Sequence, residues 1–132
     1  MKLVTSTGDF TGYVGSIEEE IRNFKDSKFK YINLEQVDKS FEQDGEQWRR
    51  KVDAWGEAAA YAGVSFLASH SPCVNAYSKM DEETYQVALR AIRRSIEACH
   101  ILGIPSTVVH ACANVDMSYW DFWKLNKRFY SD

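Results

Sequence analysis

The sequence predicts an α/β fold in which a parallel sheet of four strands is flanked by helices. Four short apolar runs with strand character alternate along the chain with four segments whose apolar residues recur at helical spacing. Strands that alternate with helices form βαβ units, and the two strands of such a unit run parallel. No Pro- or Gly-rich linker interrupts the 132 residues, so we expect a single domain over residues 1–132.

The first unit is predicted to contain a strand at residues 2–7 and a helix that begins after Ser16. Ser16 and Glu19 have the separation of a capping box, in which each side chain accepts a hydrogen bond from the backbone N–H of the other residue. The apolar face of this helix would consist of Ile17, Ile21 and Phe24.

The second unit is predicted to contain a strand at residues 29–36 and a longer helix at about residues 46–62. Gly63 follows this helix at the position where a left-handed capping residue belongs. The apolar face of the helix would consist of Trp48, Val52, Trp55, Ala59 and Ala62.

The last two units are predicted to have strands at residues 64–69 and 105–111. Asp81 is expected to cap the third helix at its start, and Gly103 to end it. The apolar face of that helix would consist of Tyr85, Ala88, Ile92, Ile96 and Cys99. Ser118 is expected to begin the fourth helix.

Two histidines occupy matching places in consecutive units. His70 follows Gly63 by seven residues, and His110 follows Gly103 by seven residues, each at the end of an apolar strand. Functional residues of parallel sheets gather at the carboxyl ends of the strands. We therefore expect the two imidazoles to lie near each other on that face of the fold.

Glu35 ends the second strand in the corresponding place and completes a candidate site with His70 and His110. Imidazole nitrogens suit divalent metals, and two of them need carboxylates or other ligands beside them. His70 and His110 are the candidate metal ligands or contacts to substrate oxygens. Glu35 is the candidate catalytic residue, as a substrate contact or as a partner that orients an imidazole. The alternative is that all three only form structural hydrogen bonds.

The remaining histidine and the cysteines are expected to be structural. His100 falls in the last turn of the third helix, where the helix dipole favours a cation. Cys73 and Cys112 follow the site histidines closely, which leaves a Cys/His zinc site open as an alternative. The chain lacks the tight C-x-x-C pairs of such sites, so free thiols in a reducing cytoplasm are the main expectation.

Composition argues against two classes of partner. The net charge is −3, without the basic stripe of a protein that binds nucleic acid. No apolar run approaches the roughly 18 residues that span a bilayer, so no membrane association is expected.

Four short motifs, taken together in order and spacing, resemble the sugar phosphate isomerase/epimerase family of xylose-isomerase-like TIM barrels. They are "KLVTST" at residues 2–7, "YINLEQ" at 31–36, "SHSP" at 69–72 and "VVHACAN" at 108–114. The resemblance covers the whole chain but only strands one to four of the eight-stranded barrel. It implies a (β/α)4 half barrel, cut within the fourth helix.

The resemblance also implies a function. Members of this family move a proton next to a sugar carbonyl, with a divalent metal (Zn, Mn or Mg) at the carboxyl ends of the strands. His70 and His110 match the histidines of its endonuclease-IV-like branch, so a metal-dependent phosphodiesterase is one alternative. A non-catalytic remnant or interaction domain is another, because half of the family's site is missing and the chain alone is expected to be inactive. The expected ligand is a sugar or sugar phosphate, and a homodimer is expected to cover the open edges of the sheet.

Overall fold

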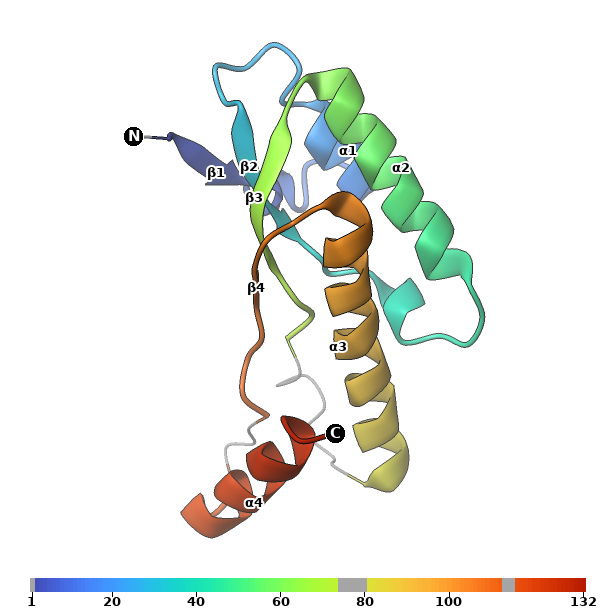
Figure 1. Cartoon of the computed structure of the whole chain (residues 1–132), viewed down its shortest axis with the longest axis vertical. Helices are drawn as coiled ribbons and strands as arrows, with labels where there is room; N and C mark the ends of the chain where they lie inside the picture. The colour runs from blue at the N-terminus through green and yellow to red at the C-terminus, as the bar shows by residue number, and fades with distance from the viewer. Residues whose placement is uncertain (1, 74–80, 113–115) are drawn as a thin grey trace.

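The computed structural model describes residues 2–73, 81–112 and 116–132 of the chain and shows an α/β fold with a four-stranded parallel sheet. Its strands lie side by side in sequence order, and its helices follow them in alternation (Figure 1). The elements are β1 (Val4–Ser6), the 3-10 helix η1 (Thr7–Phe10), α1 (Ile17–Arg22), β2 (Tyr31–Glu35), the 3-10 helix η2 (Lys39–Phe41), α2 (Gln47–Ala62), β3 (Ser65–His70), α3 (Glu82–Leu102), β4 (Thr107–Val108) and α4 (Tyr119–Phe129). The predicted fold class is therefore confirmed at this level.

The strand pairing brings the carboxyl ends of β2, β3 and β4 together. Glu35 lies opposite His70 in the β2–β3 register, and His70 lies opposite Val108 in the β3–β4 register. The β2–β3 register shifts between Ile32 and Asn33, so β3 contains one residue more than β2 over the paired stretch.

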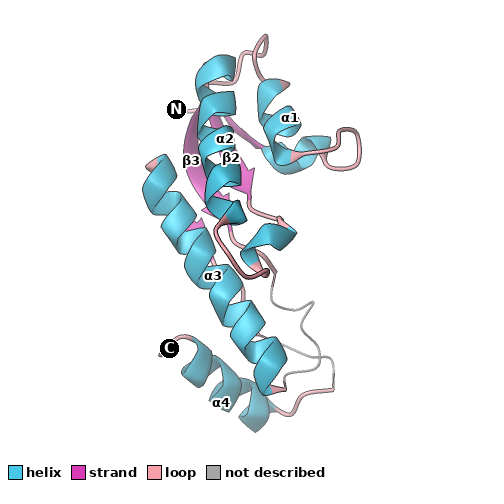
Figure 2. Ribbon diagram, turned by 90° about the vertical axis from the view of Figure 1, so that its right-hand side faces the viewer, coloured by secondary structure: helices cyan, strands magenta, loops and turns pink. Residues whose placement is uncertain are grey.

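Helices α1, α2 and α3 lie on the same side of the sheet (Figures 1 and 2). The buried side chains between them and the sheet form the main core. Along β2, Ile32 and Leu34 are fully buried in this core, whereas Tyr31, Asn33 and Glu35 between them are partly exposed. Because side chains alternate along a strand, Tyr31, Asn33 and Glu35 lie on the face of the sheet opposite the helices, which we call the open face.

The predicted starts of α1 and α3 and the predicted ends of α2 and α3 are confirmed. The Ser16 hydroxyl accepts a hydrogen bond from the Glu19 backbone N–H (3.2 Å), and the Asp81 carboxylate accepts one from Thr84 N–H (2.8 Å). Gly63 and Gly103 end α2 and α3 with φ values of 68° and 66°. A residue with a side chain would be strained in this left-handed conformation, which explains both glycines.

Two expectations about the second half need correction. β4 is only Thr107–Val108, not residues 105–111, because its pairing with β3 is limited to two residues. Ile96 is 50% exposed and does not belong to the buried face of α3. That face is centred on small side chains, which let α3 approach α2 and the sheet closely. They are Ala88, Ala91, Ser95 and Ala98.

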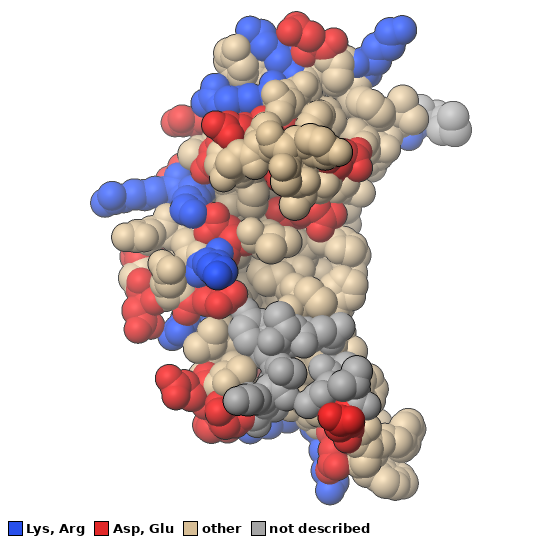
Figure 3. All heavy atoms as spheres, turned by 180° about the vertical axis from the view of Figure 1, so that it is seen from behind, with Lys and Arg blue, Asp and Glu red and all other residues tan. Residues whose placement is uncertain are grey.

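The two faces of the sheet differ in charge. In Figure 3, Lys, Arg, Asp and Glu side chains gather over the helical side, whereas the opposite flank is mostly uncharged and concave. None of the described helices has the length and apolar character needed to cross a bilayer.

Helix α4 is attached to the amino-terminal half of α3 by a small apolar cluster and by polar contacts. Phe129 packs edge-on against Tyr85, with ring centroids 6.0 Å apart. The Tyr85 hydroxyl donates a hydrogen bond to the Asp132 carboxylate (2.7 Å). Arg128 donates two hydrogen bonds to the Glu82 carboxylate (3.0 and 2.7 Å). This bidentate contact lowers the pKa of Glu82 from its ordinary value of 4.5 to about 2.

The attachment of α4 is expected to weaken in acid. A carboxylate with a lowered pKa in the folded state stabilises the fold above its unfolded pKa of 4.5, and this contribution is lost as the pH falls toward about 2. Thermal unfolding measured from neutral to acid pH should give a higher Tm for the wild type than for Arg128→Gln at neutral pH. This difference in Tm should disappear as the pH falls from 4.5 toward about 2. A difference that stays constant across the window would contradict the assignment to Glu82.

Candidate functional site

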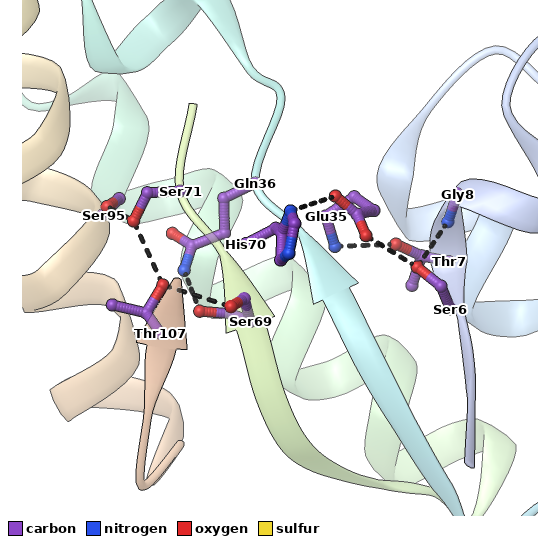
Figure 4. Close-up of polar contacts among 10 residues, drawn as sticks. All are labelled: Ser6, Thr7, Gly8, Glu35, Gln36, Ser69, His70, Ser71, Ser95 and Thr107. Atoms are coloured by element: carbon purple, nitrogen blue, oxygen red, sulfur yellow. Dashed lines mark hydrogen bonds and ion pairs between the residues drawn. The ribbon is translucent and has the colours of Figure 1, made fainter. Parts of the chain in front are cut away.

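The candidate site lies at the carboxyl ends of the central strands. Glu35 is the last residue of β2 and His70 the last residue of β3, and Figure 4 shows their side chains pointing toward each other. Both lie on the open face of the sheet. Ser69, the residue before His70 in β3, points to the helices, where its hydroxyl contacts Cys99 (3.1 Å), so His70 points the opposite way. His110 follows β4 and reaches the same place.

The structure thus brings together the three residues singled out from the sequence. Glu35 Oε2 and His70 Nδ1 are 3.7 Å apart, which is longer than a hydrogen bond. The rings of His70 and His110 lie edge to face, with centroids 5.1 Å apart and planes at 72°. The side chains of Glu35 and His70 are 29% and 43% exposed, so a ligand on the open face can reach them.

The carboxylate of Glu35 is fixed by the end of the first strand. Ser6 donates a hydrogen bond to Glu35 Oε1 (2.9 Å), and the Thr7 hydroxyl accepts one from the Glu35 backbone N–H (3.0 Å). A Cβ atom on Gly8 would lie only 3.1 Å from Glu35 Cγ, so glycine leaves room for the carboxylate side chain. One carboxylate oxygen is therefore held by Ser6, while the other faces His70 (Figure 4).

A buried polar layer supports His70 from the helical side. The His70 carbonyl accepts a hydrogen bond from Gln36 N–H (2.9 Å), and the buried Gln36 amide donates to Ser69 Oγ (2.9 Å). Next to it, the Ser71 hydroxyl contacts Ser95 on α3 (2.6 Å) and Thr107 on β4 (3.1 Å). These contacts join β2, β3, β4 and α3 directly behind the site, so they restrict the position of His70.

The segment after His110 is held by α4. Asn126 Oδ1 accepts a hydrogen bond from the Cys112 backbone N–H, and Asn126 Nδ2 donates one to the Cys112 carbonyl, both at 2.8 Å. Asn126 is buried, and a third hydrogen bond joins it to the Phe122 carbonyl. This amide therefore anchors the chain two residues beyond His110. The motif at 108–114 extends past Cys112 into residues that lie outside the described part.

A second carboxylate lies near Glu35. Burial raises the pKa of Glu20 above its usual value, a hydrogen bond from Thr11 Oγ1 (3.1 Å) opposes this, and the negative charge of Glu35 raises it further.

The other residues considered from the sequence are not part of this cluster. Cys99 and Cys112 are buried and Cys73 is exposed, and all three are free thiols. Burial raises the pKa of the Cys112 thiol to about 11. His100 is exposed in the last turn of α3, as expected.

The donor types of the cluster, one carboxylate oxygen and imidazole nitrogens, are those that bind divalent metals in proteins. Across residues 2–73, 81–112 and 116–132, no group of three or more His, Cys, Asp or Glu side chains is already arranged to hold a metal ion.

Sequence reasoning did not identify Ser6, Thr7, Gly8, Gln36 and Asn126. The first three carry a usable signal, because "STG" directly follows the first strand and so reaches the same edge of the sheet. The other two are single polar residues whose partners are far away in the chain.

The chain matches no protein-family model and no curated protein.

Proposed function

We propose that the chain is half of a (β/α)8-type barrel of the sugar phosphate isomerase/epimerase class, and that Glu35, His70 and His110 bind the oxygens of a sugar or sugar phosphate. The observation that supports this most is the convergence of one carboxylate and two imidazoles at the carboxyl ends of parallel strands, on a face that described helices leave open. Ligands of parallel α/β folds bind at this end of the sheet.

The proposed chemistry is proton transfer next to a sugar carbonyl. Glu35 Oε2 is free of the hydrogen bond that holds Oε1, so it can accept a proton from the carbon beside the carbonyl. His70, 3.7 Å away, can donate a hydrogen bond to the carbonyl oxygen as negative charge develops there. His110 offers a second imidazole for a neighbouring hydroxyl.

The spacing also suits a shared divalent metal. Tetrahedral ligands at about 2.0–2.1 Å from a metal lie roughly 3.4 Å from each other, close to the 3.7 Å between Glu35 Oε2 and His70 Nδ1. A bound metal would supply Lewis-acid polarisation of the sugar carbonyl. Glu35 and His70 have the spacing to hold it, His110 would have to turn its ring toward the ion, and substrate or water would supply the remaining ligands.

The test is ligand binding by the intact protein and by the double variant His70→Ala/His110→Ala. Calorimetric titration with Zn²⁺ or Mn²⁺, and with a panel of aldoses, ketoses and their phosphates, should show binding by the wild type. We expect the double variant to weaken it at least about tenfold, because each lost donor removes a direct contact. His100→Ala is the matched control, since it removes an exposed imidazole outside the cluster.

The Glu35→Gln variant separates proton transfer from binding. Gln keeps the size and the acceptor for Ser6 but cannot accept the proton, so with any sugar that the protein converts, kcat should fall about 10²–10⁴-fold with little change in KM. Metal and sugar binding that are the same in the wild type and the double histidine variant would refute the proposed site.

A further inference from the structure

Asn33 is a polar side chain at the centre of the open face. It lies in the middle of β2, two residues before Glu35, and it is partly exposed. Asparagine is depleted in β-strands, where branched and aromatic side chains pack better. No residue in the described part of the chain forms a hydrogen bond with the Asn33 side chain. Its two N–H donors and its carbonyl acceptor can therefore serve a ligand.

The side chains on either side of Asn33 are small. Ser6 of β1 and Ala68 of β3 are its partners in the two strand registers, so the three residues form one row across the open face. Neighbouring strands are about 4.8 Å apart, and three short side chains in such a row leave room above them. Figure 3 shows the flank opposite the helices as concave and mostly uncharged. This row therefore offers a floor for a ligand that extends from Glu35 toward the middle of the sheet.

We propose that the substrate of this site is an uncharged sugar that lies along β2, and that Asn33 binds one of its hydroxyl groups while Glu35 and His70 bind its carbonyl end. The assignment rests on the proposed function, from which the position of the carbonyl is taken. It adds the direction of the substrate, its class and a residue that selects it.

The separation of Asn33 and Glu35 suits a pentose or a hexose. Two residues of a parallel strand span about 6.6 Å, and side chains on one face of a sheet stand roughly side by side. An extended carbon chain with bonds of about 1.5 Å reaches this length after roughly five bonds. A sugar of this size can thus present its carbonyl to Glu35 and a hydroxyl near its other end to Asn33.

The chemistry of Asn33 favours a hydroxyl over a phosphate. An amide and a hydroxyl each donate and accept hydrogen bonds, so they can pair in either direction. A phosphate carries negative charge and is recognised best by arginine and lysine. The charged residue of β2 is Glu35, and its carboxylate would repel a phosphate held at Asn33.

The test compares sugar binding with stability in the full chain. Asn33→Val removes the amide and introduces a side chain that favours a strand. We expect this variant to unfold at the same urea concentration as the wild type or at a higher one. Its binding of fructose and glucose should be at least about tenfold weaker, because a hydroxyl of the sugar would face an apolar side chain.

Ser65→Val is the matched control. Ser65 is exposed and pairs with Tyr31 in the β2–β3 register, so it lies on the same face about 13 Å along the strands from Glu35. The same kind of change at this position should leave sugar binding unaltered.

Two NMR measurements identify the contact. When the wild type is titrated with the sugar, the side-chain NH₂ signals of Asn33 should shift, while those of the exposed Asn23 should not. Analogues that each lack one hydroxyl then show which group is bound. The analogue without that hydroxyl should bind the wild type about tenfold more weakly than the parent sugar, and both should bind Asn33→Val equally.

The outcomes separate this assignment from the proposed function. Equal sugar binding by the wild type and Asn33→Val overturns the assignment, as does tighter binding of the terminal phosphates of these sugars than of the free sugars. If His70→Ala/His110→Ala still weakens binding in those cases, the proposed function stands. If only Asn33→Val weakens it, Asn33 is a sugar contact and the proposed function is refuted. A wild type that binds none of these sugars overturns both.

Discussion

Replacing Trp55 by alanine is expected to lower the free energy of unfolding by about 3–5 kcal/mol. Trp55 is fully buried in the core between α2 and the sheet, and its ring packs edge-on against Phe41 with centroids 5.8 Å apart. Removing the indole leaves a cavity that helix and sheet cannot both move to fill. Because domains of this size are stable by only about 5–15 kcal/mol, a large part of the stability would be lost.

Urea unfolding followed by far-ultraviolet circular dichroism measures this change. Trp123→Ala is the matched control, since Trp123 is half exposed on α4 and the same atoms are removed. We expect that variant to change stability by less than about 0.5 kcal/mol. Equal losses in the two variants would show that the core is not centred where α2 crosses the sheet.

Replacing Asn126 by alanine is expected to cost roughly 2–3 kcal/mol and to release the segment after β4. The substitution leaves the buried N–H and C=O groups of Cys112 without their partner, and an unsatisfied buried polar group costs about 1–3 kcal/mol. His110 lies two residues before this anchor, so ligand binding should weaken even though Asn126 does not contact the site.

Hydrogen exchange is the most direct measurement, because the Cys112 amide should lose protection in Asn126→Ala. Asn126→Asp adds a second comparison: it keeps the acceptor for Cys112 N–H but loses the donor to two carbonyls. The control is Asn23→Ala, which removes an exposed amide at the end of α1. Unchanged protection of Cys112 in Asn126→Ala would argue against the anchoring role.

The features predicted correctly from the sequence are those with local causes. Ser16 and Asp81 begin helices by binding N–H groups three residues away, and Gly63 and Gly103 end them by adopting a left-handed conformation. Such signals lie within a few neighbouring residues. Parallel pairing followed from the alternation of strands and helices, and it is also what places Glu35 beside His70.

The features that were missed depend on partners far away in the chain. Gln36 pairs with Ser69, 33 residues away, and Asn126 pairs with Cys112, 14 residues away, so neither residue has a local pattern. The exposure of Ile96 has a similar cause. Helical spacing fits several faces of α3 equally well, and packing against α2 selected the face with the smaller side chains.

The irregular register between β2 and β3 decides which residue of β3 lies opposite Glu35. At its start, the Ser65 N–H binds the Lys30 carbonyl, and at its end the His70 carbonyl receives the Gln36 N–H. Between these fixed points the strand contains one residue more than its neighbour, and the shift at Ile32 and Asn33 absorbs it. Without this shift Glu35 would lie opposite Ser69, whose side chain points to the helices, so the extra residue of β3 is what brings His70 to the open face beside Glu35.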